Sequence, residues 1–401
     1  MSKTNGLVTS VITLAALTGA LLVSGCQKKP QEAEIKIGQS MPYSGVASVY
    51  GAIGKAELAF FKMINEQGGI NGRKINLISY DDTYVPAKAM EQTRKLVESD
   101  GVAFIFNSVG TANNTAVQPY LNQKKVPQLF VATGADKWAD PEKFPWTIGW
   151  QPSYRVEATV YARYVLKEKP NAKVCVLYQN DDFGKDYLIG LKTGFGDQYD
   201  KLVIKTASYE TSDPTVDSQI VTLQGAGCDT LISATTPKWG TGAIRKVFDI
   251  GWKPMFLMSN VSISIPSVLK PAGLEKSVGL VSAQYLKDPG APDMASDPAI
   301  QDYKAFMKKY MPDHDATDTN AIYAYAVSST LVQVLKQCGD DVSRENIMKQ
   351  AASLHKLIIP VALAGIELTT SPTDFRVFSQ MQLAKFNGTT FERFGEVVSA
   401  D

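Results

Sequence analysis

Residues 35–80 read IKIGQSMPYSGVASVYGAIGKAELAFFKMINEQGGINGRKINLISY, and this stretch contains the repeating unit that decides the fold. Residues 35–41 predict a strand. The apolar side chains that follow recur at helical spacing, namely Ala52, Ala56, Ala59, Phe60, Met63 and Ile64. Gly68 and Gly69 suit the left-handed residue that ends a helix, and residues 75–80 predict a second strand. A strand, a helix and another strand in this order predict a βαβ unit with parallel strands.

The same alternation extends along most of the chain, in two runs. The first run adds helices at 86–98 and 112–123 and strands at 102–106 and 126–132. The second run has helices at 154–166, 184–195, 216–223 and 242–248 and strands at 173–178, 202–209, 230–234 and 255–258. Later patterns predict helices near 299–311, 319–336 and 343–354, and then strands and turns over 366–394. Residues 136–153, rich in Trp and Pro and without periodicity, predict a domain crossing between the runs.

Length and composition agree with a two-domain soluble protein. The chain has 401 residues, which is more than one typical core holds. Hydrophobic residues make up 44% and charged residues 20%, as in ordinary globular proteins. The 41 Lys and Arg nearly cancel the 40 Asp and Glu, and no basic run stands out. Nucleic-acid binding therefore has no support in the sequence.

The N-terminus has the layout of an export signal. Lys3 gives a positive start, and a mostly apolar run over residues 11–23 follows. The stretch Leu22-Val23-Ser24-Gly25-Cys26 then places a cysteine directly after small residues. This ending resembles the lipobox of bacterial lipoproteins, in which the thiol receives a diacylglyceryl group. We therefore expect an exported protein, periplasmic or at the cell surface, that is anchored through Cys26.

The expected processing divides the N-terminus into a signal peptide over residues 1–25 and a tether over 26–34. The alternative is an uncleaved transmembrane anchor, because residues 6–25 are uncharged and nearly long enough to span a bilayer. Threonine, serine and glycine residues dilute that run, which favours the lipoprotein. No second apolar segment of the sequence reaches membrane-spanning length.

Three cysteines remain after Cys26, an odd number for an oxidising compartment. Cys175 lies inside a predicted buried strand, and Cys228 precedes another. We expect both to be buried free thiols, with a disulfide between them as the alternative. Cys338 completes the set, and no C-x-x-C pair suggests a zinc or redox site.

The sequence lacks the patterns of the common catalytic sites. Its two histidines, His314 and His355, belong to no nucleophile or metal motif. The pairs Asp81-Asp82 and Asp181-Asp182 follow predicted strands, where aspartates commonly cap the next turn or helix. We therefore expect a binding protein rather than an enzyme, with neither a cofactor nor a metal.

Several short stretches, in their order and spacing, are similar to one known family. They are IKIG at 35–38, PYSG at 42–45, YG at 50–51, INEQGGINGR at 64–73, YDD at 80–82, VP at 126–127, NDDFGKD at 180–186 and GWKP at 251–254. Together they resemble the branched-chain amino-acid type of ABC-transporter substrate-binding protein, over residues 35–394. The patterns NDDFGKDY and GWKP also resemble the subgroup that is associated with aromatic acids.

The resemblance implies a periplasmic-binding-protein type I fold. This is an α/β fold with two Rossmann-like lobes, three crossovers and the ligand in the cleft between the lobes. One lobe would take residues 35–152 and 282–360, and the other 153–281 and 361–401. The lobes would close around the ligand by a hinge movement, and the membrane subunits of an ABC permease would then recognise the closed form. We expect a monomer that meets the membrane only through its lipid anchor.

The family's binding positions carry over to residues on several loops. From the first lobe they are Tyr50, the loop Gly110-Thr111-Ala112 and the loop Ala132-Thr133-Gly134, and from the second lobe Phe183, Thr236 and Asn260. Backbone N–H groups of residues 110–112 would face an anionic group, helped by the helix dipole. We also expect Trp239 at the cleft. Further aromatic residues either lie near the cleft or pack the lobes, namely Tyr43, Tyr84, Trp138 and Trp150.

Two departures from the family pattern bear on the ligand. Thr236 stands at a position that is aromatic in the family, and Asn260 stands where an acid holds the ligand's α-ammonium. An asparagine cannot neutralise a buried cation. We therefore expect a small carboxylate without an amino group, with an aromatic acid such as a benzoate or a phenylpropenoate as the leading class.

Three other functions remain to be weighed. The first is a branched-chain or other amino-acid binding protein of the same importer family, and the second is a ligand sensor or receptor of the same fold. An extracellular enzyme is the third, and the missing catalytic motifs disfavour it. The lipid anchor favours transport, because it keeps a soluble receptor near a membrane permease.

Overall fold

The computed structural model describes residues 1–2 and 34–399, and within 34–399 it shows two sheets. The first sheet has the strand order β2-β1-β3-β4-β5, and all its pairings are parallel. Its strands are β1 (Glu34–Met41), β2 (Lys74–Asp81), β3 (Phe104–Phe106), β4 (Gln128–Val131) and β5 (Thr147–Gly149). All three residues of β3 are buried, as expected of a strand that is covered on both faces.

The second sheet has seven strands in the order β12-β11-β10-β9-β8-β6-β7. They are β6 (Val174–Gln179), β7 (Val203–Tyr209), β8 (Thr230–Ala234), β9 (Met255–Met258), β10 (Val281–Gln284), β11 (Gln380–Phe386) and β12 (Phe391–Ser399). Strands β6 to β10 pair in parallel. The hairpin of β11 and β12 joins this sheet antiparallel, alongside β10.

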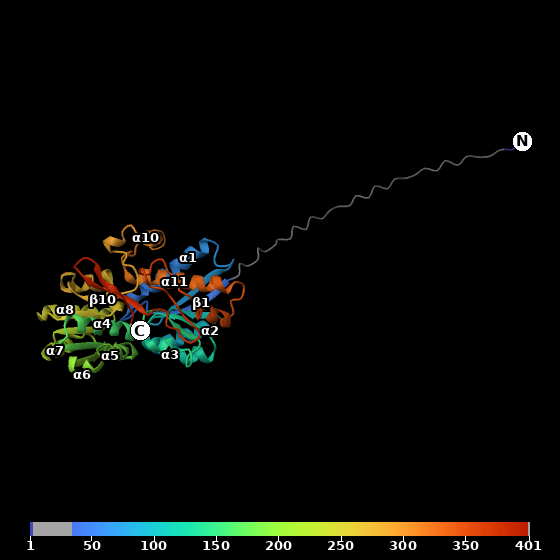
Figure 1. The fold of residues 1–401 in the computed structure, drawn as a ribbon. Coiled ribbons are helices and arrows are strands. Elements are labelled where there is room, and N and C mark those ends of the chain that lie inside the picture. The colour runs from blue at the N-terminus through green and yellow to red at the C-terminus, as the bar shows by residue number, and fades with distance from the viewer. Residues whose placement is uncertain (3–33, 400–401) are drawn as a thin grey trace. The chain divides into compact units, whose positions relative to one another are not determined.

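Helices cover both sheets (Figure 1). They are α1 (Gly51–Glu66), α2 (Pro86–Glu98), α3 (Thr111–Gln123), α4 (Tyr154–Glu168), α5 (Asp182–Phe195), α6 (Tyr199–Leu202), α7 (Asp217–Gly225), α8 (Pro237–Asp249), α9 (Lys270–Ala272), α10 (Pro298–Tyr310), α11 (Thr319–Cys338) and α12 (Arg344–Ala351). In Figure 1, α1, α2, α3 and α11 surround β1, while α4, α5, α7 and α8 lie on the other side of the molecule. The α/β class with two lobes is therefore confirmed.

The first βαβ unit forms as its periodicity predicts. Ala56 and Phe60 of α1 are buried against the first sheet, while Lys55 and Lys62 of the same helix are exposed. The chain after α1 turns back through Gly69, whose φ is +76°. A Cβ at Gly69 would lie 2.1 Å from the carbonyl oxygen of Arg73, so only glycine fits here.

Two short strands lie where the sequence did not predict them. Thr147–Gly149 form β5, inside the segment that was predicted as a domain crossing. Strand β10 was not predicted at all, because four buried residues show no periodicity that separates a strand from a loop. The strand-and-turn segment predicted over residues 366–394 contributes β11 and the start of β12, which run antiparallel to their neighbours.

Cys175 and Cys228 form a disulfide, so the expectation of free thiols was wrong. Cys175 lies in β6, and Cys228 lies just before β8, which pairs directly with β6. This pairing brings the two Cα atoms to 5.8 Å, within the range that a disulfide requires. The pairing of β6 with β8 could not be recognised from the sequence, because β7, not β8, follows β6 along the chain. Cys338 is a buried free thiol.

Helix α11 packs against α1 and the first sheet. Its Tyr323 hydroxyl donates to Asn107, just beyond β3, at 2.9 Å, and its Thr330 hydroxyl accepts from the Trp150 indole at 3.1 Å. The division of the chain between the lobes stays a prediction. The sheets nevertheless assign the strands up to Gly149 to one layer and the strands from Val174 onward to the other.

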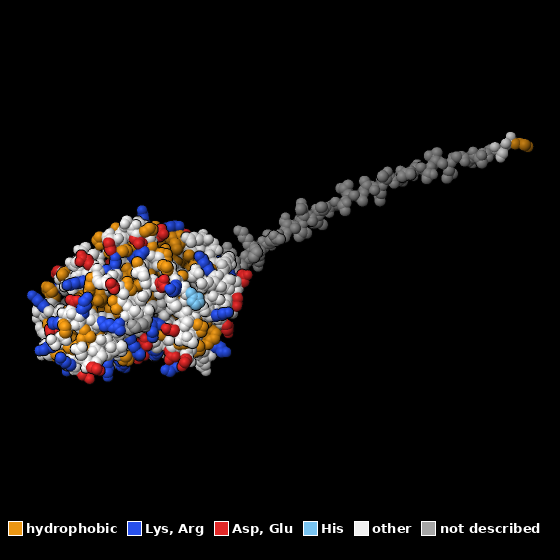
Figure 2. Space-filling view, in the orientation of Figure 1, with side chains coloured by type: hydrophobic (Ala, Val, Ile, Leu, Met, Phe, Trp, Pro, Cys, Tyr) orange, Lys and Arg blue, Asp and Glu red, His pale blue; other side chains and the backbone are white. Residues whose placement is uncertain are grey.

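The surface of the described residues is mixed in charge. Figure 2 shows acidic and basic side chains interspersed over the face in view, without a continuous basic area. Among the residues that the structure describes, none of the helices combines the length and the apolar character needed to cross a bilayer.

The disulfide yields a stability prediction. A bridge between residues 53 positions apart restricts the unfolded chain, and its loss typically costs about 2–4 kcal/mol. We expect the Cys175→Ala/Cys228→Ala double variant to melt at a lower temperature than the wild type, and dithiothreitol to lower the wild-type midpoint only. Equal midpoints for variant and wild type in thermal unfolding would contradict the bridge.

Candidate functional site

A cavity with an empty volume of about 870 Å³, partly open to solvent, lies between the two sheets. The loops that follow most of the strands contribute residues to the lining of this cavity. Tyr50 follows β1, Tyr84 follows β2, Gly110 follows β3 and Ala132 follows β4; from the second sheet, Phe183 follows β6, Thr236 follows β8, Asn260 follows β9 and Tyr285 follows β10. Ligands of parallel α/β sheets bind at the carboxyl ends of the strands, and here two such ends share one space.

Most of the residues that the sequence singled out meet at this cavity. They are Tyr50, Gly110, Thr111, Ala132, Thr133, Phe183, Thr236 and Asn260. Ala112 and Gly134 neighbour lining residues in sequence but do not line the cavity themselves. The Gly134 carbonyl accepts the backbone N–H of Tyr154 at 2.7 Å, which fixes the start of α4.

Trp239 lies elsewhere. Its ring is 1% exposed and stacks on Tyr209 with centroids 5.0 Å apart, and its indole N–H donates to the Asp213 carbonyl at 3.1 Å. Trp239 thus packs inside the second lobe, and the expectation that it faces the cleft is corrected. The burial of α8 from Trp239 to Val247 explains this placement.

The start of α3 forms one wall of the cavity. Gly110 is its N-cap and has no side chain with which to cap the helix, so the first N–H groups of α3 need other partners. Gly110 has a φ of +105°, and a Cβ there would lie 2.7 Å from the Tyr84 ring. The hydroxyls of Thr111 and Thr133 hydrogen-bond each other at 2.5 Å beside this helix start. The wall therefore combines N–H donors, hydroxyls and a positive helix end, which suits an anion.

Aromatic rings form a second wall. Phe183 contacts Tyr154 with ring centroids 4.5 Å apart, and Tyr50 and Tyr84 also line the cavity. Of the aromatic residues whose placement the sequence left open, only Tyr84 reaches the cavity. Tyr43 hydrogen-bonds Ser79, Trp138 is buried, and Trp150 packs against Tyr323 at 5.2 Å.

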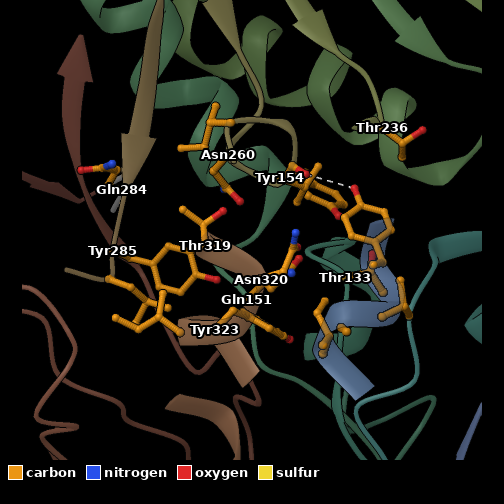
Figure 3. A pocket seen from close by; sticks show the side chains of 18 of the residues that line it. Thr133, Gln151, Tyr154, Thr236, Asn260, Gln284, Tyr285, Thr319, Asn320 and Tyr323 are labelled. Carbon is orange, nitrogen blue, oxygen red and sulfur yellow. Dashed lines mark hydrogen bonds between the residues drawn. The ribbon is translucent and has the colours of Figure 1, made fainter. Parts of the chain in front are cut away.

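Sequence reasoning missed about two thirds of the lining residues. The missed residues include Gln151, Tyr154, Gln284, Tyr285, Lys287, Asp288, Thr319, Asn320 and Tyr323 (Figure 3). Gln151 follows β5 and residues 285–288 follow β10, the two strands that were not predicted. Recognition of those strands would have identified the loops after them by the carboxyl-end rule. Thr319 and Asn320 begin α11, and the helix start was the available signal.

Asn260 does not stand alone at the cavity. Behind it lies Glu157 of α4, which is 0% exposed and does not line the cavity. Glu157 accepts the Asn260 backbone N–H at 2.7 Å and the Asn260 Nδ2 at 2.8 Å, and it also accepts the Tyr161 hydroxyl at 2.6 Å. Burial raises the pKa of Glu157 to about 7, although these hydrogen bonds oppose the shift. An acid is therefore present near the expected position, one layer deeper than the sequence suggested.

The charged side chains that line the cavity are already engaged. Lys287 forms an ion pair with Asp297 at 2.7 Å. Asp288 accepts the backbone N–H of Gly290 at 2.8 Å, and burial raises the pKa of Asp288 above its ordinary value. These pairings leave the uncapped start of α3 as the better electrostatic match for a ligand anion.

Two hydrogen bonds connect opposite sides of the cavity. The Tyr50 hydroxyl, on the loop after β1, donates to the Val261 carbonyl after β9 at 3.1 Å. The Ser264 hydroxyl donates to Asp318, the N-cap of α11, at 2.9 Å. The first bond joins loops that follow strands of different sheets, and the second joins the segment after β9 to the start of α11, which packs against α1. Both bonds therefore lie where relative movement of the lobes would make and break contacts.

The aspartate pairs act as expected from the sequence. Asp181 caps α5 by accepting the backbone N–H groups of Phe183 and Gly184 at 3.0 and 3.4 Å. Asp82 accepts the backbone N–H of Tyr84 at 2.8 Å, and Asp81 accepts that of Thr83 at 2.9 Å. Burial raises the pKa of Asp181 to about 6. Asp81, Asp82 and Asp181 thus stabilise the turns that they begin, whereas Asp182 forms an ion pair with Lys137 at 3.2 Å.

Comparisons with known proteins agree with this geometry. A family model described as periplasmic binding protein matches residues 34–390. A Leu/Ile/Val-binding protein homolog from Brucella suis is 25% identical, over 78% of this chain and 81% of its own length. A branched-chain amino acid ABC transporter structure from Thermus thermophilus with bound valine has a TM-score of 0.82, with 15% identity over 92% of this chain and 97% of its own. A solute-binding protein from R. palustris in complex with 4-hydroxybenzoate has a TM-score of 0.76, with 17% identity over 91% and 97% of the two chains.

The buried Glu157 predicts how stability depends on pH. A folded-state pKa of about 7 against an ordinary 4.5 means that the folded chain binds more protons between these values. The contribution of Glu157 to the free energy of unfolding is therefore fully present below pH 4.5. It is lost as the pH rises through 7, and the total loss is roughly 3 kcal/mol. Glu157→Gln cannot titrate. We expect urea unfolding to show that the wild type loses stability relative to the variant between pH 5 and pH 8. The free energy of unfolding of the variant minus that of the wild type should therefore increase with pH. A constant difference would show that Glu157 does not titrate there.

Proposed function

Because this chain belongs to the periplasmic binding protein family, we propose that it is the lipid-anchored receptor of an ABC importer for a small aromatic carboxylate. The coarser part of this statement follows from the family, whose members are solute-binding proteins of ABC transporters and not enzymes. The proposal adds the ligand class, the lipid anchor at Cys26 and the delivery of the ligand to a permease as a monomer.

The observation that carries the ligand class is the pairing of an anion-binding helix start with aromatic walls in one cavity. The N–H groups of α3 and the hydroxyls of Thr111 and Thr133 would hold the carboxylate. Phe183, Tyr154 and Tyr50 would enclose the ring. A charge-assisted hydrogen bond contributes roughly 1.5–3 kcal/mol, and each aromatic pair roughly 0.5–1.5 kcal/mol beyond area burial. Together these interactions suit a flat acid that is enclosed by the lobes.

The alternative ligand is a branched-chain amino acid, as the names of the Brucella relatives and the valine-bound Thermus structure suggest. An α-ammonium needs an ionised acceptor close by. At the position concerned the cavity presents the neutral amide of Asn260, while Glu157 is taken up by three donors from the protein. The 4-hydroxybenzoate complex of the R. palustris neighbour supports the aromatic class.

Ligand-driven closure would couple binding to transport. A ligand that contacts both lobes binds the closed form better and shifts the population toward it. The hydrogen bonds from Tyr50 to Val261 and from Ser264 to Asp318 would then hold the lobes together. A sensor of the same fold would close in the same way, and the anchor at Cys26, which lies outside the described residues, is the feature that favours transport.

The ligand class is tested by a thermal-shift panel, because a ligand that binds the native state raises the melting temperature. We expect benzoates or cinnamates to give the largest shifts and L-leucine or L-valine to give none. Phe183→Ala should abolish the shift for aromatic acids while the unliganded midpoint shows how much the lost packing costs. A leading response to leucine, with the aromatic acids silent, would reject the aromatic class.

The anchor is tested by Cys26→Ser. We expect the wild type to be cleaved before Cys26, to carry lipid there and to fractionate with membranes, and the serine variant to appear in the soluble extracytoplasmic fraction. Mass spectrometry of the mature N-terminus supplies the direct measurement. A variant that remains uncleaved in the membrane would indicate a transmembrane anchor instead.

A further inference from the structure

Glu157 holds Asn260 by both its backbone and its side chain. One carboxylate oxygen accepts the Asn260 backbone N–H at 2.7 Å and the Tyr161 hydroxyl at 2.6 Å. The other oxygen accepts Nδ2 of Asn260 at 2.8 Å. The carboxylate is fully buried in α4, and Asn260 separates it from the cavity. Two bonds to one carboxylate leave Asn260 little rotational freedom.

The same bonds decide which end of the Asn260 amide faces the cavity. An ionised carboxylate only accepts hydrogen bonds, so it selects the nitrogen end of the amide and repels the oxygen end. The amide is planar, and its oxygen points away from the direction of its nitrogen. Asn260 is half-buried and lines the cavity, as does Thr319 across the view in Figure 3. With Nδ2 held by Glu157, Oδ1 is the acceptor that the Asn260 side chain offers to a ligand.

We infer that Glu157 is a positioning residue that orients the Asn260 amide so that Oδ1 accepts a hydrogen bond from the ligand, and that the ligand presents a hydroxyl donor to it. The inference rests on the proposed function and narrows its ligand class to hydroxy-substituted aromatic carboxylates. The carboxylate of such a ligand would occupy the start of α3, and its hydroxyl would face Asn260. One wall of the cavity would thus bind the anionic group of the ligand, and another would accept a hydrogen bond from its neutral hydroxyl.

Ligands that carry an acceptor-only substituent in place of the hydroxyl test whether Asn260 requires a donor. A fluorine in place of the hydroxyl would face the Asn260 oxygen without a hydrogen between them, so the Asn260 oxygen would lose the hydrogen bond from the ligand. Sites built around a hydrogen bond reject analogues that lack it far more strongly than apolar sites reject a missing methylene. We expect a preference of at least tenfold for the hydroxyl compound over its fluorine counterpart.

The test measures the wild type by isothermal titration calorimetry at pH 8, with matched pairs of ligands. The pairs are 4-hydroxybenzoate with 4-fluorobenzoate, 3-hydroxybenzoate with 3-fluorobenzoate, and L-leucine with 4-methylpentanoate, which lacks the amino group. We expect the hydroxyl member of at least one aromatic pair to bind tenfold or more tightly than its partner.

Two variants and one control locate the cause. Glu157→Gln can donate to Asn260 Oδ1 and so allows the amide to turn its nitrogen toward the cavity, which should reduce the preference to less than threefold. Asn260→Ala removes the acceptor and should do the same, even if Glu157→Gln folds poorly. The control is Glu57→Gln, because Glu57 is an equally buried carboxylate that accepts Asn107 Nδ2 at 2.6 Å in the first lobe. Its variant should keep the wild-type preference.

The outcomes separate this inference from the proposed function. Equal affinities within both aromatic pairs overturn the acceptor assignment while the aromatic class stands. Aromatic acids that fail to bind, with L-leucine binding at least tenfold better than 4-methylpentanoate, overturn the aromatic class and retain Asn260 as an acceptor, then of an ammonium. A preference that survives in both Glu157→Gln and Asn260→Ala overturns the positioning role, and silence of all six ligands overturns both proposals.

Discussion

The structure depends on one constraint, which is that parallel strands deliver all their carboxyl ends to the same edge of a sheet. In this chain two sheets meet with those edges facing each other, so the loops after nine strands contribute to one cavity. Backbone N–H groups and helix starts collect at that edge because each strand is followed by a helix. The binding chemistry therefore follows from topology, and the side chains only refine it. Gly110 illustrates the point, since its contribution is the absence of a side chain.

The sequence predicted the elements that carry either a helical period or a continuous apolar run. The residues from Ala52 to Ile64 show the first signal, and the buried strand after Val102 shows the second. Strands β5 (TIG) and β10 (VSAQ) interrupt their apolar residues with Thr, Gly, Ser or Gln, so they were missed together with the loops after them and the cavity residues on those loops. Neighbouring strands that are not consecutive are also invisible in a sequence. For this reason the Cys175–Cys228 bridge was judged wrongly.

Site residues were predictable where they lie on loops that match binding loops of the family. They were not predictable where a side chain from the middle of a helix, such as Glu157, supports a site residue. Glu157 lies within the amphipathic pattern of α4, where a polar residue ordinarily faces solvent. Its burial beside Asn260 follows from the placement of α4 against the second sheet, which no local signal reveals. Trp239 shows the opposite error, because an aromatic residue near the cleft in sequence turned inward to stack on Tyr209. Proximity along the chain was a weaker guide than the direction of each side chain.

The position of the disulfide has a mechanical consequence. Both sulfur atoms belong to the second sheet, one in β6 and the other in the segment that leads into β8. The covalent link therefore joins two neighbouring segments of one sheet and does not connect the two sheets. In the closure proposed above, relative movement of the lobes would neither stretch nor break the bridge. Covalent rigidity within the second sheet is thus compatible with an equilibrium between open and closed forms that the ligand alone would shift.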